Sequence, residues 1–260
     1  MESAAWTAGD EPLVGIVGTD PDSSAGEPSL EESLEGILAE YDGSVVPGAV
    51  ETVCGADPSF VVALGDAALF ELLQSGACAD APVLPVGCRP ETEGPRPDGL
   101  TDAVRTLLEG DARVRVHPVL AVEIGDRQRH RALWDVTLAT DEPARISEYS
   151  IESRGESIDR FRADGVVVAT PAGSRGYANA VDGPILSAAV EAVVAAPIAP
   201  FDTHTDRWVL PNDDLVLSVE RDESAVAVSV DGRTLETITV DTPVHITADG
   251  SLSTLVIPDE

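Results

Sequence analysis

The sequence predicts an α/β domain followed by a β-rich domain, because two patterns succeed one another along its 260 residues. From Leu13 to about Gly110, short apolar runs alternate with segments of helical periodicity, as in a parallel sheet covered by helices on both faces. After about Ala112, period-2 alternation takes over, which is typical of strands in a sandwich or layered sheets. We therefore predict a Rossmann-like α/β domain over 1–112 and a β-sandwich-like domain over 113–260, leaving open a return of the extreme C-terminus to the first domain.

The elements of the first domain are predicted from apolar runs and from the capping, Pro and Gly residues that bound them. Strands are expected at 13–17 (LVGIV), 60–64 (FVVAL) and 83–87 (VLPVG), and helices at 29–41, 66–76 and 99–110. Ser29 is placed to open the first helix. The segment from Cys88 to Gly99 is rich in Pro and Gly, which predicts a loop. The acidic N-terminus up to Pro12 is expected to be frayed.

The second domain reads almost entirely as strands. Alternating runs predict strands at 115–124, 131–139, 144–153, 214–220, 225–230 and 234–240. Asp231 and Gly232 stand between the last two runs, and this dipeptide is a strong signal for a hairpin turn. A Gly-rich segment, 164–184, is embedded among these strands.

Charge limits the classes of partner. Asp and Glu total 47 against 16 Lys and Arg, the net charge is −31, and all sixteen cations are arginine. Such a surface suits a protein dissolved in concentrated salt, which screens the repulsion between carboxylates. We expect a halophilic protein, with an acidic protein from a high-GC genome as the alternative. Nucleic-acid and anionic-membrane binding are disfavoured, because both require a positive face.

Cysteine usage and hydropathy predict a cytoplasmic protein. Cys54, Cys78 and Cys88 are odd in number and form no CxxC pair, so we expect reduced, buried thiols and neither a disulfide framework nor a zinc site. No leader-like segment follows Met1, and no apolar stretch approaches the roughly 18 residues of a membrane span.

Asp66 is the first candidate for chemistry. It follows a buried strand in VVALGDAALFELL and is placed as the N-cap of the next helix. The carboxylate could simply satisfy the helix terminus. The same geometry also suits ligand binding, because ligands enter open α/β sheets at the carboxyl ends of the strands. The sequence leaves both interpretations open.

The second candidate is the turn in DGVVVATPAGSRGYANAVDGP, residues 164–184. Pro171, Gly173, Ser174 and Gly176 follow an apolar strand, and we expect them to leave backbone N–H groups accessible to a ligand. The alternative is a strand, a tight turn and a short helix of small residues packed against a sheet.

Three side chains around this turn could form a nucleotide cradle. Asp164 could accept from ribose hydroxyls, Arg175 could bind phosphate, and the Tyr177 ring could contact a base.

These motifs together resemble those of the NAD kinase family. DGVVVATPAGSRGYANAVDGPIL is similar to that family's long Gly-rich signature, and ALGDAAL resembles its Gly-Gly-Asp-Gly-Thr loop. LWDV at 133–136 occupies the place of its Asn-acid pair. IAPFDTHTDRWVLP and VSVDGR resemble its later segments, so the resemblance covers essentially the whole chain.

The resemblance implies a two-domain fold of this kind and the phosphorylation of the 2′-hydroxyl of the NAD adenosine ribose. It implies ATP or polyphosphate as donor, a divalent metal such as Mg²⁺, and a homo-oligomer, a dimer or a tetramer. Asp66 aligns with the catalytic aspartate of the family. The residues that the resemblance places at the nucleotide are Gly65, Ala67, Trp134, Asp135, Arg145, Arg162, Asp164, Arg175, Gly176, Tyr177, Ala178, Asn179, Ala180 and Arg233.

The sequence also departs from the family pattern. Leu64, Ala67 and Ala68 replace two glycines and a threonine of the phosphate loop, and Trp134 adds bulk in place of an Asn. Arg175, in place of a threonine, adds a charge that suits a phosphate. These changes keep two alternatives open: a catalytically impaired, nucleotide-binding or regulatory relative, and a related kinase that acts on another substrate, such as a lipid or a sugar.

Overall fold

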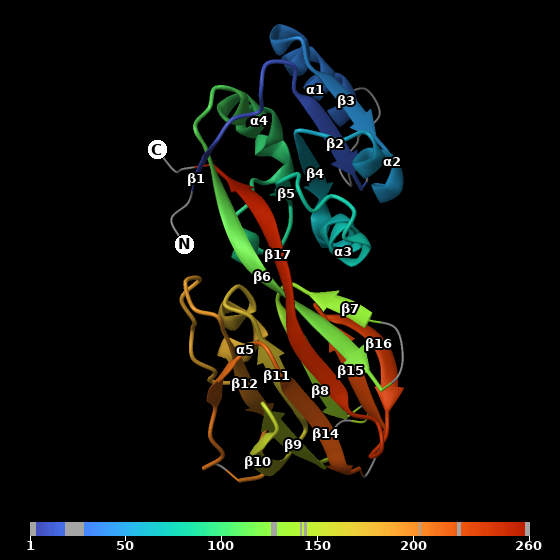
Figure 1. The fold of residues 1–260 in the computed structure, drawn as a ribbon, viewed down its shortest axis with the longest axis vertical. Helices are drawn as coiled ribbons and strands as arrows, with labels where there is room; N and C mark the ends of the chain where they lie inside the picture. The colour runs from blue at the N-terminus through green and yellow to red at the C-terminus, as the bar shows by residue number, and fades with distance from the viewer. Residues whose placement is uncertain are drawn as a thin grey trace. The chain divides into compact units, whose positions relative to one another are not determined.

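A computed structural model describes residues 4–18, 29–125, 129–140, 142, 145–202, 204–222 and 225–257 (Figure 1). The chain divides into two compact units: the part up to Val116 together with the segment from Leu252, and the part from His117 to Ser251. Two long strands, β6 (Ala112–Ile124) and β17 (Val244–Val256), contribute to both units. Among the described residues, no helix is both long and apolar enough to cross a membrane.

The first unit is built around a parallel sheet. Its strands are β1 (Ala4–Trp6), β2 (Leu13–Val17), β3 (Ser44–Pro47), β4 (Phe60–Leu64) and β5 (Val83–Val86). Its helices are α1 (Leu30–Leu38), α2 (Val50–Gly55), α3 (Gly65–Ser75) and α4 (Leu100–Leu108), with short 3₁₀ turns η1 (Ala39–Tyr41), η2 (Pro90–Thr92) and η3 (Pro97–Gly99). The sheet order is β3-β2-β4-β5, all parallel, and the end of β17 adds beside β5.

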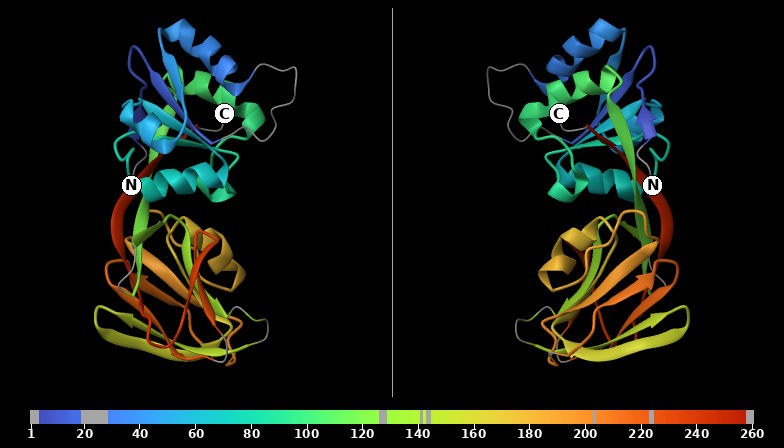
Figure 2. Two further views of the ribbon diagram at one scale, coloured as in Figure 1. Left: turned by 90° about the vertical axis from the view of Figure 1, so that its right-hand side faces the viewer. Right: turned by 90° about the vertical axis from the view of Figure 1, so that its left-hand side faces the viewer.

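Helices cover both faces of this sheet (Figures 1 and 2). Alternate residues of β4 explain why: Phe60 and Val62 enter the core that α1 and α4 build. On the other face, a Cβ on Gly15 would lie 2.3 Å from the Val53 side chain, so α2 can pack closely only because Gly15 has no side chain. Ser29 caps α1 through a reciprocal capping box with Glu32, as its position predicts.

The predicted elements of this unit are present, with two refinements. The loop over 88–99 contains the 3₁₀ turns η2 and η3. The expectation of a frayed N-terminus is wrong for β1, which pairs antiparallel with β6. Trp6 explains the difference, because its ring packs edge-on against Phe60 with the ring centroids 5.6 Å apart.

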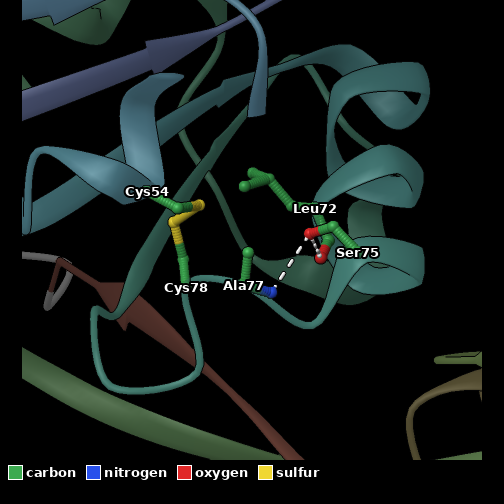
Figure 3. Close-up of a disulfide and its surroundings, with 5 residues drawn as sticks. All are labelled: Cys54, Leu72, Ser75, Ala77 and Cys78. Carbon is green, nitrogen blue, oxygen red and sulfur yellow. Dashed lines mark hydrogen bonds between the residues drawn. A yellow bond between two sulfur atoms is a disulfide. The ribbon is translucent and has the colours of Figure 1, made fainter. Parts of the chain in front are cut away.

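The expectation of three reduced cysteines is also wrong, because Cys54 and Cys78 form a disulfide (Figure 3). Gly76 ends α3 in the left-handed conformation, and the chain then turns back toward α2. Ala77 donates its N–H to the Ser75 hydroxyl in this turn, 3.2 Å away. The 24-residue spacing between the cysteines gave no sequence signal, since only the fold brings the two Cα atoms to 5.1 Å.

The second unit consists of antiparallel strands. Its strands are β7 (Arg129–Ala132), β8 (Asp135–Thr140), β9 (Ser147–Ser153), β10 (Glu156–Ala163), β11 (Gly165–Ala169), β12 (Ala192–Ile198), β13 (Trp208–Pro211), β14 (Leu215–Arg221), β15 (Val226–Val230) and β16 (Arg233–Ile238). One sheet has the order β13-β12-β11-β8-β15-β16, and β10, β9, β14 and the start of β17 form another layer. The 3₁₀ turn η4 (Gly173–Arg175) and the short helix α5 (Tyr177–Ala180) follow β11.

Three predicted strands have different limits in the structure. The run 131–139 is broken, since β7 ends at Ala132 and β8 begins at Asp135. Strand β9 begins at Ser147, and residue 144 of the predicted run lies outside the described residues. Strand β16 ends at Ile238. The hairpin between β15 and β16 turns at Asp231 and Gly232, as predicted.

Candidate functional site

A pocket lies where the strands of the first unit end. It has a volume of about 530 Å³, and its lining comes from the ends of β4 and β5, from α3 and from the turn after β2. Gly18 makes room at this turn, since its φ is +99° and a Cβ there would lie 2.8 Å from the Leu64 carbonyl oxygen. The lining residues are Gly18, Leu30, Leu64, Gly65, Asp66, Ala67, Ala68, Glu71, Val86, Gly87, Pro97 and Leu100. The position agrees with the rule that open α/β sheets bind ligands at the carboxyl ends of their strands.

Asp66 lines this pocket, but it is not the N-cap that the sequence predicted. Leu64 occupies the N-cap position, and Gly65, with φ +79°, lets α3 begin one residue before Asp66. The Asp66 carboxylate therefore lies in the first helical turn, where the helix dipole favours a negative charge. Its Oδ1 accepts from the Arg89 backbone N–H at 2.9 Å, and its Oδ2 accepts from Arg89 Nε at 3.2 Å.

The rest of the lining is mainly apolar. Among the described lining residues, the charged side chains are those of Asp66 and Glu71. Leu64, Ala67 and Ala68, the three departures in the loop, all contribute apolar surface to this pocket. A polyphosphate placed here would therefore need positive charge from another source, such as a bound cation.

Cys88 adjoins the pocket as a protonated thiol. Burial, and then the nearby Asp66 carboxylate, raise the pKa of Cys88 to about 12. Its Sγ lies 3.9 Å from the Ala63 carbonyl oxygen and 3.8 Å from that of Val86. Since the thiolate is the nucleophilic form, Cys88 is not suited to covalent chemistry at neutral pH.

In the second unit, a buried carboxylate organises the break between β7 and β8. Asp231 is 4% exposed and accepts the backbone N–H groups of Leu133, Trp134 and Asp135 at 2.9, 2.7 and 3.1 Å. These bonds take three N–H groups that a continuous strand would give to a neighbouring strand, so the strand is interrupted. Burial is the main cause that raises the pKa of Asp231 to about 6, although the three N–H bonds oppose the shift.

The Gly-rich turn packs against this break. Thr170 donates its hydroxyl to the Leu133 carbonyl at 2.6 Å, and the Thr170 N–H donates to the Trp134 carbonyl at 2.9 Å. Gly173 is required here, because a Cβ would lie 2.0 Å from the Trp134 carbonyl oxygen.

The expectation of an open backbone in this turn is therefore wrong at the positions that led to it. The N–H groups of Gly173, Ser174 and Gly176 donate to Thr170 Oγ1, the Thr170 carbonyl and the Gly173 carbonyl. The Ser174 hydroxyl is buried, donates to the Pro171 carbonyl and accepts the Leu186 N–H. The glycines and small residues close the turn onto its neighbours, which agrees with the packing alternative.

The turn nevertheless presents a polar cluster of Asp135, Asp164 and Tyr177. Tyr177 begins α5 and is 44% exposed. Burial, then the charges of Asp135 and Asp164, raise the pKa of the Tyr177 hydroxyl. Asp135 begins β8, which pairs with β11, and Asp164 directly precedes β11. Three of the predicted site residues thus lie near one another.

The other predicted residues of this unit have varied environments. Arg175, Asn179 and Ala180 are exposed on η4 and α5, Ala178 is buried, and Gly176 lies between them. Trp134 is 2% exposed, so its indole packs inside the unit and adds no bulk at the surface.

The remaining predicted arginines lie on other elements. Arg145 is paired with Glu142, with Nε 3.3 Å from Oε2. The Arg162 guanidinium lies over the Phe201 ring, 5.2 Å from its centroid. Arg233 is exposed at the start of β16, two residues after Asp231.

The sequence of the second unit matches a known protein family. Residues 133–256 match the model of the ATP-NAD kinase C-terminal domain. This match includes Asp135, Asp164, the Gly-rich turn and Asp231. The matched residues, just under half of the chain, are similar to the C-terminal domain of the NAD kinase family.

Similar NAD kinases occur in methanogenic archaea. The chain is 32% identical to an NAD kinase of Methanopyrus kandleri over 161 residues, covering 62% of this chain and 55% of the relative. It is 33% identical to an NAD kinase of Methanosarcina barkeri over 154 residues, covering 58% and 54%. The chain thus spans about half the length of the curated relatives that it matches.

Two solved structures of NAD and NADH kinases show the same fold. Yeast NADH kinase complexed with NADH has a TM-score of 0.73 at 18% identity, covering 95% of this chain and 84% of that chain. An NAD kinase from Archaeoglobus fulgidus in complex with ATP has a TM-score of 0.71 at 21% identity, covering 95% and 94%. The α/β unit and the β-rich unit are both part of this NAD kinase fold.

Asp231 and Thr170 are site residues that the sequence analysis did not select. Both act through buried hydrogen bonds to backbone groups far away in the sequence, as in the pair of Asp231 and Trp134, 97 residues apart. The motif VSVDGR predicted the hairpin, and it was the only signal for Asp231.

Proposed function

We propose that this protein is a member of the NAD kinase family and transfers a phosphoryl group from ATP or polyphosphate to the 2′-hydroxyl of the adenosine ribose of NAD. The support is the pocket at the carboxyl ends of β2, β4 and β5, with the Asp66 carboxylate in its wall. The family and the ATP-bound Archaeoglobus relative favour the same chemistry.

In this proposal Asp66 is the general base. Its carboxylate accepts the proton of the 2′-hydroxyl while the ribose oxygen forms a bond to the transferred phosphorus and the bond from that phosphorus to its leaving oxygen breaks. The leaving group departs as ADP or as a shortened polyphosphate. General bases of this kind contribute about 10²-fold to 10⁴-fold to a rate.

The second unit supplies the proposed contacts to NAD. Asp164 would accept from ribose hydroxyls, and the half-exposed Tyr177 ring would contact the base. The exposed Arg175 would bind a phosphate of the dinucleotide.

A divalent cation such as Mg²⁺ fits this scheme as a companion of the donor phosphates. No cluster of three or more His, Cys, Asp or Glu in the described part of the chain could hold a metal by itself. Mg²⁺ usually needs only one or two protein carboxylates besides phosphate and water, and Asp66 and Glu71 line the pocket. When bound, the cation offsets the charge of the transferred phosphoryl group.

The experiment is the formation of NADP in molar KCl with Mg²⁺ and NAD, with ATP or polyphosphate as donor. An NADP-specific dehydrogenase detects the product, and NADH, a lipid and a sugar serve as alternative acceptors. NADP formed with either donor supports the proposal. Phosphorylation of another acceptor but not of NAD or NADH would overturn it in favour of a related kinase.

A second candidate is a catalytically impaired, nucleotide-binding relative. The observation that favours it is the apolar lining by Leu64, Ala67 and Ala68, where a donor phosphate would lie. Calorimetric titration separates the two functions. NAD binding that is lost in Arg175→Ala, without turnover by the native protein, would support the second candidate.

We further propose that the protein acts in the cytoplasm and that it is a homo-oligomer, a dimer or a tetramer, as the family resemblance implies for the assembly. Light scattering in molar KCl measures the mass, and a mass near that of one 27.1 kDa chain would contradict this assembly.

A further inference from the structure

Arg89 is joined to Asp66 by two different hydrogen bonds. Its backbone N–H donates to Oδ1 at 2.9 Å, and its side-chain Nε donates to Oδ2 at 3.2 Å. One residue thus holds both oxygens of the carboxylate. Two bonds to the two oxygens fix the rotation of the carboxylate plane, which a single bond would leave free.

The backbone of Arg89 is itself firmly held. Arg89 precedes the 3₁₀ turn η2, and its carbonyl accepts the N–H and the hydroxyl of Thr92 at 3.0 and 2.7 Å. Pro90 fixes the backbone at the start of this turn.

The strand end before Arg89 is anchored as well. Gly87 donates its N–H to the Pro95 carbonyl at 3.0 Å. Gly94 packs directly on the backbone of β5, where a Cβ would overlap the Pro85 carbonyl. The Arg89 donors are therefore carried by a loop attached to β5, beside the strand β4 that leads to Asp66.

We infer that Arg89 is a positioning residue for the reaction: it orients the Asp66 carboxylate so that a remaining lone pair faces the substrate hydroxyl. This inference rests on the proposed function, in which Asp66 is the base. Each carboxylate oxygen can accept more than one hydrogen bond, so the two bonds from Arg89 leave capacity for the substrate. Arg89 acts through Asp66.

The solvent exposure of Arg89 and Asp66 indicates whether loss of the Arg89 side chain affects turnover or stability. The side chains of Arg89 and Asp66 are 33% and 41% exposed. Ion pairs with this much solvent contribute little to stability. A misplacement of a catalytic group by ~1 Å, by contrast, can cost about 100-fold in rate. The loss of the guanidinium should therefore change turnover much more than folding.

The test compares Arg89→Ala and Arg89→Lys with the native enzyme under saturating NAD and donor. We expect kcat to fall about tenfold to 100-fold in Arg89→Ala, with KM for NAD within about twofold and an unchanged unfolding midpoint. Arg89→Lys should recover part of the loss. In an Asp66→Asn background, Arg89→Ala should cause no further loss.

Arg105→Ala is the matched control, since Arg105 is paired with Glu40 at 3.6 Å, outside the pocket lining. A kcat for Arg89→Ala equal to that of the native enzyme or of this control would overturn the inference. So would a decrease in kcat on Arg89→Ala by the same factor in the native and in the Asp66→Asn background. Failure of the proposed function looks different: the native enzyme makes no NADP, or Asp66→Asn is as active as the native enzyme, and the inference then falls with it.

Discussion

The Asp231 carboxylate shows how one residue can determine the local path of the chain. It accepts three backbone N–H groups at the break between β7 and β8. Thr170 of the Gly-rich turn donates hydrogen bonds to the carbonyls of Leu133 and Trp134 in the same break. Asp135 begins β8 immediately after the break. The placement of a predicted nucleotide contact therefore depends on a residue that is itself buried.

Asp231→Asn should lower the free energy of unfolding by about 1–3 kcal/mol near neutral pH, because an amide cannot accept all three N–H groups. The raised pKa adds a pH dependence. The contribution of Asp231 to stability is full below about pH 4, where the unfolded chain is also protonated, and it is lost as the pH rises through about 6. The difference in the free energy of unfolding between the native protein and Asp231→Asn should narrow by about 1 kcal/mol from about pH 5 to about pH 7.5, as measured by urea titrations.

Asp213→Asn is the matched control, because Asp213 forms an exposed pair with Arg154 at 2.7 Å. Such pairs contribute about 1 kcal/mol or less. If the difference in the free energy of unfolding between the native protein and Asp231→Asn is constant with pH, or widens as the pH rises, the raised pKa of Asp231 is contradicted.

Gly173→Ala tests the packing of the Gly-rich turn. The new Cβ would lie 2.0 Å from the Trp134 carbonyl oxygen, which is backbone and cannot turn aside. We expect the free energy of unfolding to fall by about 3 kcal/mol or more. Gly36→Ala is the control, since a Cβ on this exposed helical glycine meets nothing within 4 Å. It should be neutral or stabilising, and equal unfolding midpoints for the two variants would refute the close approach at Gly173.

At the scale of elements, the sequence predicted most strands and helices because their periodicity is local. Phe60 and Val62, for example, alternate with residues of the opposite face within a single strand. Three of the misses share a non-local cause. Trp6 orders β1 through Phe60, Asp231 interrupts a strand, and Cys54 meets Cys78 only after α3 has turned the chain.

The disulfide joins α2 to the turn after α3, two elements on one face of the parallel sheet (Figure 3). Closing a loop of 24 residues reduces the entropy of the unfolded chain, so Cys54→Ser should lower the free energy of unfolding by about 2–4 kcal/mol. Cys88→Ser, which removes the free thiol, is the control for side-chain loss. Urea titrations with and without reductant measure both. No effect of reductant on the native protein, together with three titratable thiols after unfolding, would refute the disulfide.

At the scale of the whole molecule, the net charge of −31 is the dominant physical property. It is visible directly in the sequence. At about 1 M salt the Debye length is about 3 Å, against about 10 Å at 0.1 M, so repulsion between surface carboxylates is strongly screened.

We predict that the unfolding temperature rises by about 10 °C between about 0.1 M and about 2 M KCl, a change of several kcal/mol for a chain of this size. Sucrose of equal osmolality is the control, because it is excluded from the surface but screens no charge. An equal rise in sucrose, or no rise in KCl, would argue against a protein adapted to salt.

The central claim is that Asp66 is the base of a phosphoryl transfer to NAD. The most direct measurement is kcat for NADP formation by the native enzyme and by Asp66→Asn, at saturating NAD and donor with Mg²⁺ in molar KCl. The account predicts turnover by the native enzyme and a loss of about 10²-fold to 10⁴-fold in the variant, with NAD binding retained in calorimetry. Equal turnover in the two proteins, or NAD binding by the native enzyme without any NADP, would contradict it.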